Sequence, residues 1–422
     1  MAKSVIVVGG GVIGLCAAWY ALKAGHRVTL LERGPGPDHD SCSLGNAGMI
    51  VPSHIVPLAA PGVIAMGLRM LPDPESPFAV RPRLSRELID WGVKFLRAST
   101  EAHVDRAAPL LRDLNLRSRA LYEALSDELP GGFGLEKRGL LMLCRTAHAL
   151  EEERALADRA NALGVPAEVL TPEAVARLDP GIDMDVAGAV YFPKDCHLAP
   201  GRLVAALTDA LQREGATLRW GAEVTGWRRA ADGASVAGVR TADGAEAEAD
   251  EYVLAGGAWT PGAARGLGLK LPMQAGKGYS MTLESPPQLP AICSILTEAR
   301  VAVTPMGGAL RIGGTMELTG TDLSVNEARV RGIRKSVPRY FPAFREEHFA
   351  GTPVWSGLRP CTPDGLPYLG RPARCRNLVV AAGHAMMGVS LAPVTGEIVA
   401  ALLGGVAPEI RDAAALSPDR YE

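Results

Sequence analysis

The chain has 422 residues, of which 47% are hydrophobic and 21% are charged, a composition typical of a globular protein with room for two cores. Its formal net charge is -2 and its Lys and Arg residues are spread along the chain, which excludes a nucleic-acid-binding protein with a basic patch. Its seven cysteines form no C-x-x-C pair and no zinc-like spacing, so we expect a reduced, cytoplasmic protein without a metal site.

Two apolar stretches resemble targeting segments at first sight. Glycines interrupt the one at the amino terminus and no small-residue cleavage site follows it, so we expect a folding unit rather than a signal peptide. The other, residues 55–71, contains Pro57, Pro61 and Arg69 and is too broken to span a membrane as a plain helix. It leaves room for peripheral contact with the inner face of a membrane.

Residues 4–33 predict a strand, a glycine turn, a helix and a second strand. The run SVIVV at 4–8 is rich in β-branched residues, as in a strand buried in a parallel sheet, and RVTLLER at 27–33 predicts the second strand. The helix between them ends near Gly25. A right-handed crossover then places the glycines at the turn between the first strand and the helix.

Gly9, Gly11 and Gly14 form the pattern G-x-G-x-x-G at that turn, and Glu32 ends the second strand. Glycines let the backbone approach a pyrophosphate, the helix N-terminus stabilises its charge, and a carboxylate accepts from ribose hydroxyls. A glutamate disfavours a ligand with a 2′-phosphate, which leaves NAD or FAD. The position of this fingerprint at the start of the chain, with VLAGGAW returning at 253–259, favours a two-domain flavoprotein.

The rest of the chain alternates between helical spacing of apolar residues and short β-branched runs with turn signals. No internal repeat or low-complexity linker separates these patterns, so we expect two domains that are interwoven along the chain. The predicted elements are helices within 83–129, over 149–163 and over 201–214, strands between 216 and 259, an antiparallel sheet over 278–314, and a final strand, glycine turn and helix over 377–405.

Several segments together resemble one known family. The chain resembles the FAD-dependent D-amino acid oxidase-like oxidoreductases, in the branch that contains bacterial D-amino acid dehydrogenase, glycine oxidase and D-hydroxyproline dehydrogenase. The resemblance covers nearly the whole chain. It rests on VIVVGGGVIGLCAAWYALKAGHRVTLLER at 5–33, NAGMIVPSH at 46–54, YVLAGGAWT at 252–260, KGYSMTL at 277–283, WSGLRPCTPDGLPYLGR at 355–371 and NLVVAAGHAMMGVSLAPVTGEIVAALL at 377–403.

This resemblance implies an α/β fold. A FAD-binding, Rossmann-like domain would be interwoven with an α+β substrate domain that contains an antiparallel sheet. We expect the FAD-binding domain to comprise 1–50, 197–270 and 351–422, and the substrate-binding domain to comprise 51–196 and 271–350.

The resemblance also implies that FAD lies along residues 41–48; an ordinary loop of Ser, Gly and Asn is the alternative. In the turn at His384 we expect the backbone N–H groups, more than the imidazole, to stabilise the reduced flavin. Cys361 directly precedes Thr-Pro-Asp, unlike the more distant cysteine of sarcosine oxidases with covalent flavin, so we expect noncovalent FAD. The expected cofactor contacts are Gly9, Gly11, Val12, Ile13, Gly14, Glu32, Arg33, Ser43, Asn46, Ala47, Gly48, Val224, Gly256, Gly257, Trp259, Gly383, His384 and Gly388.

For the substrate, the resemblance implies that Arg359 in GLRP binds the carboxylate, since a guanidinium offers paired donors and keeps its charge. A structural salt bridge is the alternative role for Arg359. Tyr279 is a second candidate donor, with a buried tyrosine bonded to the backbone as the alternative. We assign no role to His197 or Lys277.

Ser53 and His54 stand where general D-amino acid dehydrogenases carry a small residue and a tyrosine, and this departure resembles the D-hydroxyproline dehydrogenases. His54 is either a donor to a ring hydroxyl of the substrate or a polar residue satisfied at a domain boundary. The first expectation is oxidation of cis-4-hydroxy-D-proline, and of D-proline, to the cyclic imine. A broad D-amino acid dehydrogenase, a glycine or sarcosine oxidase, and a noncatalytic flavin-binding sensor or subunit remain alternatives. The electron acceptor would be a quinone, an artificial acceptor or oxygen.

Overall fold

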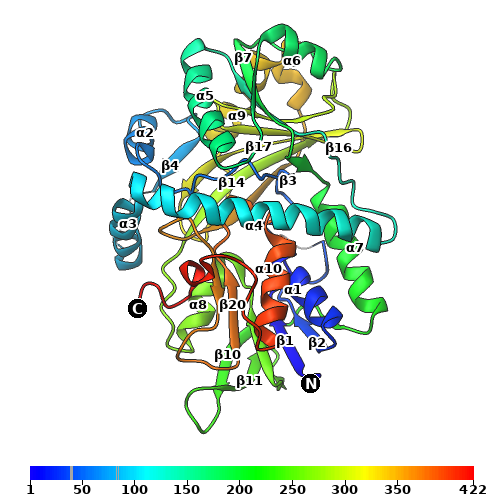
Figure 1. Ribbon diagram of the computed structural model, residues 1–422, viewed down its shortest axis with the longest axis vertical. Helices are drawn as coiled ribbons and strands as arrows, with labels where there is room; N and C mark the ends of the chain where they lie inside the picture. The colour runs from blue at the N-terminus through cyan, green and yellow to red at the C-terminus, as the bar shows by residue number, and fades with distance from the viewer. Residues whose placement is uncertain (39–40, 82, 84) are drawn as a thin grey trace.

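The computed structural model describes residues 1–38, 41–81, 83 and 85–422. Its lower half in Figure 1 is built on a six-stranded sheet whose neighbouring strands are parallel except for the outermost pair, β19 and β20. The buried, β-branched β1 lies near the middle of this sheet, as its sequence predicts. The strand order is β19 (Tyr368–Gly370), β20 (Leu378–Ala382), β13 (Glu251–Leu254), β1 (Ser4–Val8), β2 (Arg27–Leu31) and β9 (Thr217–Arg219).

The upper half contains a nine-stranded mixed sheet in which antiparallel pairs dominate. Its edge strand, β18, contacts the segments 257–259 and 385–387, which follow two strands of the six-stranded sheet. The order is β18 (Val354–Cys361), β14 (Gln274–Leu283), β17 (Ala309–Leu318), β16 (Val301–Met306), β15 (Cys293–Leu296), β5 (Leu140–Cys144), β7 (Gly188–Phe192) and β6 (Glu168–Leu170), with β4 (Phe78–Val80) paired to β17.

Two small sheets and the helices complete the described chain. The two-stranded sheet ties the segment after the predicted flavin loop to the segment before α7. The small sheets are β10 (Val224–Arg229), β11 (Val236–Thr241) and β12 (Glu246–Ala247), and β3 (Met49–Ile50) with β8 (Cys196–His197). The helices are α1 (Val12–Lys23), α2 (Val63–Met70), α3 (Arg86–Ala98), α4 (Glu101–Glu128), α5 (Ala147–Ala162), α6 (Pro172–Leu178), α7 (Pro200–Arg213), α8 (Thr260–Arg265), α9 (Glu327–Tyr340) and α10 (Ala392–Leu403).

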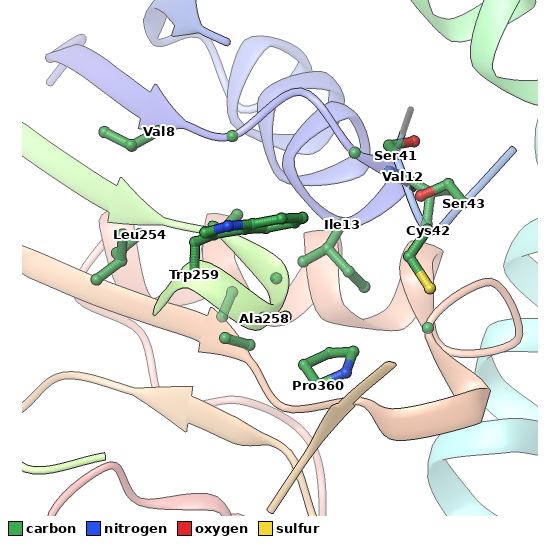
Figure 2. A pocket seen from close by; sticks show the side chains of 18 of the residues that line it. Val8, Val12, Ile13, Ser41, Cys42, Ser43, Leu254, Ala258, Trp259 and Pro360 are labelled. Carbon is green, nitrogen blue, oxygen red and sulfur yellow. Dashed lines mark hydrogen bonds between the residues drawn. The ribbon is translucent and has the colours of Figure 1, made fainter. Parts of the chain in front are cut away.

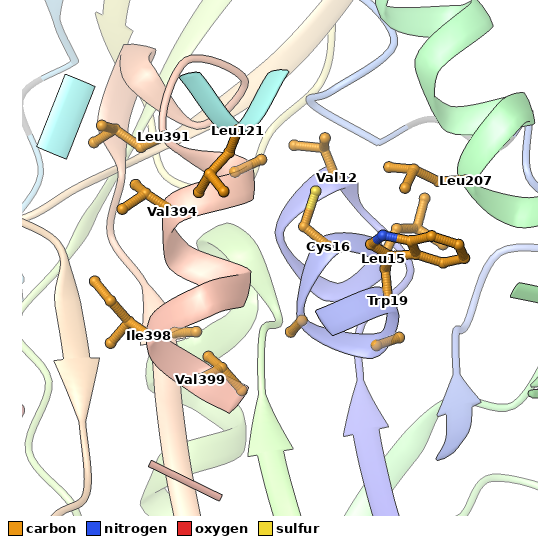
Figure 3. Close-up of a cluster of buried hydrophobic side chains, with 14 of the residues drawn as sticks. Val12, Leu15, Cys16, Trp19, Leu121, Leu207, Leu391, Val394, Ile398 and Val399 are labelled. Atoms are coloured by element: carbon orange, nitrogen blue, oxygen red, sulfur yellow. The ribbon is translucent and has the colours of Figure 1, made fainter. Parts of the chain in front are cut away.

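The core that supports the glycine turn joins the first helix of the chain to its last long one. In Figure 3, α1 and α10 run side by side, with Leu121 of α4 and Leu207 of α7 packed against them. Gly396 permits this close approach, because a Cβ there would lie 2.6 Å from the carbonyl oxygen of Cys16. Both helices are mostly buried, so their burial fixes the turn that precedes α1.

The predicted fold class is confirmed: the molecule has a mainly parallel α/β part and a part with antiparallel sheet. The helices expected within 83–129 are α3 and α4. Thr100 separates them, and its hydroxyl accepts from the backbone N–H of His103 and caps α4.

The division into two discontinuous domains stays a prediction. The sheets show that β18, within the segment 351–422, pairs with β14 rather than with the six-stranded sheet. Among the described residues, no helix is both long and apolar enough to cross a bilayer.

Candidate active site

The turn between β1 and α1 requires its glycines for steric reasons. Gly9 has a φ of +113° and approaches β13 so closely that a Cβ would lie 2.4 Å from the carbonyl oxygen of Ala255. A Cβ on Gly14 would lie 1.8 Å from the carbonyl oxygen of Gly9. Gly11 is the N-cap of α1, so the first N–H groups of this helix face the space beyond the turn. The turn therefore offers backbone donors and a positive helix end to an anion.

Glu32 lies beside this turn, at the end of β2. Its carboxylate is 6% exposed and accepts from the backbone N–H groups of Gly10 at 2.5 Å and Gly34 at 2.7 Å. The guanidinium of the next residue, Arg33, stacks over the ring of Trp259 at 3.7 Å. An acid and a stacked pair thus lie at one end of the site, where a ribose and an aromatic base would fit.

These groups line one large cavity, with about 1200 Å³ of empty space including its open mouth. Figure 2 shows its walls: the end of β1 and the start of α1, the segment after β13, the residues 41–43, and Pro360 of β18. The predicted contacts that line it are Gly9, Gly11, Val12, Ile13, Glu32, Arg33, Ser43, Asn46, Val224, Gly256, Gly257, Trp259, Gly383, His384 and Gly388.

Three predicted contacts do not line the cavity. Gly14 instead lets α1 pack against the turn. Gly48 has a φ of +73°, and a Cβ on it would lie 2.1 Å from the carbonyl oxygen of Leu198. Ala47 packs against a hydrophobic cluster that includes Met49 and Val51. Their smallness serves packing in this structure, and their contact with a cofactor stays a prediction.

Several residues that line the cavity are not among the predicted contacts. Some, such as Ala258, lie next to predicted contacts in the same segment, and this proximity in sequence could have identified them. Others come from strand ends, where side-chain direction depends on the sheet. Ser41 and Cys42 lie in the segment 41–48 that was expected to run along FAD, although they were not named as contacts. The other residues outside the prediction include Val8, Leu31, Ala222, Glu223, Leu254, Ala255, Ala258, Ala263, Leu358, Pro360, Ala381, Ala382, Ala385 and Val389.

The loop around Ser43 is tied to both walls of the cavity. The Ser43 hydroxyl accepts from the backbone N–H of Val12 at 3.0 Å, in the first turn of α1. The Asn46 side chain accepts from the N–H of Gly48 at 2.8 Å and donates to the carbonyl of Met386 at 3.4 Å. Arg311 of β17 donates to the carbonyl oxygens of Leu44 and Asn46. These bonds make the loop a fixed part of the cavity wall.

Arg359 lies on the sheet face that looks toward this loop. It pairs with Gly276 of β14, and the same face carries Ser280 and Arg311, which holds the loop. Its guanidinium lies flat over Gly278, where a Cβ would be 2.0 Å from Nη1, and donates to the carbonyl of Thr315 at 2.7 Å. One N–H is thus used by the backbone, and no acidic partner within 4 Å is recorded for Arg359 among the described residues.

Arg359 also lies close to the cavity. Its chain neighbours Leu358 and Pro360 line it, although Arg359 itself does not. Burial raises the pKa of the Cys42 thiol, and the charge of Arg359 opposes this shift, so the guanidinium lies within electrostatic reach of a cavity wall. Its expected role in binding a carboxylate stays a prediction, and no structural salt bridge competes with it among the described residues.

Tyr279 lies on the opposite face of the same sheet. It alternates with Gly278 along β14 and packs in the hydrophobic cluster with Met281 and Ile312. Its hydroxyl donates to Glu317 at 2.6 Å and accepts from the backbone N–H of Asn326 at 3.1 Å. The structure therefore does not bring Tyr279 together with Arg359, and its phenol already has two partners.

His54 and His384 lie in different surroundings. His384 is buried at the cavity wall, its Nε2 lies 2.9 Å from the Thr395 hydroxyl, and burial lowers its pKa to about 3, so the ring is neutral. That state agrees with a backbone rather than an imidazole role. His54 is half-buried and does not itself line this cavity, its Nδ1 lies 3.1 Å from the Ser53 hydroxyl, and burial lowers its pKa to about 4.

Comparison with known proteins accounts for this site. The family model described as FAD dependent oxidoreductase, abbreviated DAO, matches residues 4–402. The chain is 36% identical over 419 residues to a D-amino acid dehydrogenase of Methylobacterium radiotolerans, covering 96% of this chain and 97% of the relative. It is 35% identical to a D-amino acid dehydrogenase of Xanthobacter autotrophicus, covering 99% of each.

The solved structures agree on the fold. Glycine oxidase from Geobacillus kaustophilus superposes with a TM-score of 0.78 at 28% identity, covering 100% of this chain and 99% of that one. L-proline dehydrogenase from P. horikoshii, at 20% identity and a TM-score of 0.73, shares the fold. The glycine turn, the buried Glu32 and the long cavity fit a dinucleotide, and the cofactor is FAD. The chain belongs to the family of FAD-dependent oxidoreductases named DAO.

Proposed function

We propose that the protein oxidises a D-amino or imino acid at Cα, with cis-4-hydroxy-D-proline and D-proline as the preferred substrates and the cyclic imine as the product. The observation that carries the proposal is Arg359, a cation without an acidic partner among the described residues, between two residues of the cavity wall. The names of the relatives, D-amino acid dehydrogenases at 36% and 35% identity, support the reaction class. The Ser53-His54 pair supports the cyclic substrate.

In this reaction the residues of the chain bind and orient, while the bound FAD supplies the hydride acceptor. Arg359 would hold the substrate carboxylate by a charge-assisted hydrogen bond, since Nη1 alone is committed to Thr315. The position of the carboxylate fixes the direction of the Cα–H bond, and such positioning supplies much of the catalysis. His54 would face the ring hydroxyl of the substrate. A site built to bind this hydroxyl rejects analogues that lack it.

An anaerobic substrate screen tests the proposal. We expect D-proline and cis-4-hydroxy-D-proline to bleach the flavin absorbance faster than D-alanine, glycine or sarcosine. If D-alanine bleaches the flavin faster, the protein is a broad D-amino acid dehydrogenase instead. If glycine or sarcosine bleaches it faster, the protein is an oxidase of those substrates. Bleaching by none of them would favour a noncatalytic sensor or subunit.

The same experiment identifies the electron acceptor. Readmitting oxygen reoxidises the flavin of an oxidase at once, whereas a dehydrogenase requires a quinone or an artificial acceptor. We also propose that FAD is bound noncovalently, because the Cys361 sulfur is buried between Gly276 and the carbonyl of Arg359. Acid precipitation should release all the flavin into the supernatant.

We propose a cytoplasmic location with peripheral contact at a membrane. Leu68 of α2 and Ile89 and Leu96 of α3 are 62%, 60% and 60% exposed, and both helices lie at one side of the molecule (Figure 1). Sedimentation with phosphatidylglycerol vesicles should decrease when all three are changed to Ser. The control Leu156→Ser, on α5, should sediment like the unmodified protein.

A further inference from the structure

A buried carboxylate lies behind His54 and has no part in the cofactor site. Asp195, in the turn between β7 and β8, is 0% exposed. Its two oxygens accept from Ser53, one from the backbone N–H at 3.0 Å and the other from the hydroxyl at 2.5 Å. The same hydroxyl oxygen lies 3.1 Å from Nδ1 of His54. Carboxylate, hydroxyl and imidazole thus form one hydrogen-bonded chain.

The charge of Asp195 has no ion-pair partner recorded within 4 Å among the described residues. The cation that acts on it, Arg119 of α4, is instead bonded to the Cys196 sulfur at 3.3 Å and to Glu123 at 3.0 Å. The other titratable groups facing it are the Cys196 and Cys293 thiols. A buried, unpaired carboxylate is costly, which makes it a candidate for function.

Asp195 and His54, the two ends of this hydrogen-bonded chain, differ strongly in their affinity for a proton. Burial raises the pKa of Asp195 to about 7, although the hydrogen bonds from Ser53 oppose the shift. Burial lowers the pKa of His54 to about 4, so this ring is neutral at pH 7. A proton that arrives at His54 near neutral pH is therefore more stable on Asp195.

We propose that His54, Ser53 and Asp195 form a proton relay that removes a proton from the substrate's ammonium group and stores it on Asp195. The proposal rests on the proposed function, which puts His54 next to the substrate, and it applies where no ring hydroxyl occupies Nε2, as with D-proline. An ammonium N–H bond breaks as Nε2 of His54 gains the proton. The Nδ1 proton passes to the Ser53 hydroxyl oxygen, and the original hydroxyl proton passes to Asp195.

The step balances without any change of oxidation state. The substrate amine becomes neutral, His54 is neutral before and after with its proton moved from Nδ1 to Nε2, and the Asp195 carboxylate becomes a carboxylic acid. Hydride loss from Cα requires a neutral amine, because its lone pair forms the new C–N double bond. A base is most effective when its pKa lies near the working pH, and the relay gives His54 the proton affinity of Asp195.

The test is the pH dependence of flavin bleaching by the holoenzyme, measured anaerobically by stopped flow with whichever amino or imino acid bleaches it fastest. We expect the limiting rate to rise through an apparent pKa near 7. In Asp195→Asn and Ser53→Ala this apparent pKa should rise by about one pH unit or more. At pH values above the new pKa, the limiting rate should return to within ~3-fold of the rate of the unmodified protein. Recovery at high pH, where the substrate arrives neutral, distinguishes a lost base from a damaged fold.

The matched control is Asp179→Asn. Asp179 is also 0% exposed, and its oxygens accept from the backbone N–H groups of Ala291 and Ile292. This variant should keep the unmodified pH profile. An unshifted profile in both relay variants, with FAD bound, overturns the proposal, and Ser53→Ala alone decides if Asp195→Asn fails to fold.

Infrared spectroscopy separates this proposal from the proposed function. Between about pH 5 and about pH 9, the resting holoenzyme should lose a carboxylic acid C=O band that is missing in Asp195→Asn. If no amine bleaches the flavin, the proposed function fails while this band still tests proton storage on Asp195. Absence of the band overturns the relay whatever the substrate.

Discussion

The cofactor side and the substrate side of this molecule are built in different ways. The turn at Gly9 and the acid at Glu32 come from 30 consecutive residues, and a single strand–helix–strand unit brings them together. Arg359, His54 and Asp195 come from three distant segments, and sheet register and loop contacts decide where they lie. Local sequence can therefore specify a cofactor turn, whereas a substrate site depends on which face of a strand each side chain takes.

The largest expected effect is on the substrate side. Arg359→Ala should lower kcat/KM by about 30-fold or more, because a charged group that binds a desolvated carboxylate is worth roughly 2–5 kcal/mol. FAD content, read from the flavin absorbance, should stay unchanged. Arg359→Lys should recover only part of the loss, since an ammonium lacks the paired donors. An unchanged kcat/KM in Arg359→Ala would show that the substrate carboxylate binds elsewhere.

On the cofactor side, Gly14→Ala should weaken FAD binding by about 10- to 100-fold, since overpacking costs about 1–3 kcal/mol. The added Cβ would lie 1.8 Å from the Gly9 carbonyl oxygen, and the rigid turn must shift. Fluorescence titration of the apoprotein measures the Kd. Gly201→Ala is the control, because nothing lies within 4 Å of its Cβ position; equal affinities would show that the turn tolerates the change.

Tyr279→Phe sharpens the contrast between the two sheet faces. It removes a hydrogen bond to the buried Glu317, so the free energy of unfolding should fall by about 1–3 kcal/mol while KM stays within ~3-fold. Tyr340→Phe, which also loses a bond to a glutamate, Glu298, is the matched control. A tenfold rise in KM for Tyr279→Phe alone would restore Tyr279 as a ligand of the carboxylate.

The smallest expected effect is on acid stability. Burial lowers the pKa of His197 to about 4 and that of His384 to about 3, so both rings stay neutral in the folded protein and become protonated in the unfolded chain below pH 6.5. The unfolded state then binds more protons, and stability falls as pH falls. His197→Gln should reduce this slope by at most about 1.4 kcal/mol per pH unit, measured by urea unfolding between about pH 6 and about pH 4.5. An unchanged slope would mean that His197 takes up its proton in the folded state.

The sequence predicted much of the fold because its signals are local. The β-branched run at Ser4–Val8 and the helical spacing of α5 and α7 are each set within one element. The cavity residues Leu358 and Pro360 were missed because their place in the cavity wall depends on β18 being an edge strand.

The dinucleotide turn, its acidic partner and the class of fold follow from the sequence alone, because glycine sterics and hydrophobic periodicity act over a few residues. Only the tertiary structure decided that Tyr279 and Arg359 lie on opposite faces of one sheet, since strand register sets side-chain direction. It alone also joined the buried Asp195 to Ser53, 142 residues apart, by a hydrogen bond. Burial, which no local pattern encodes, sets the protonation of that group.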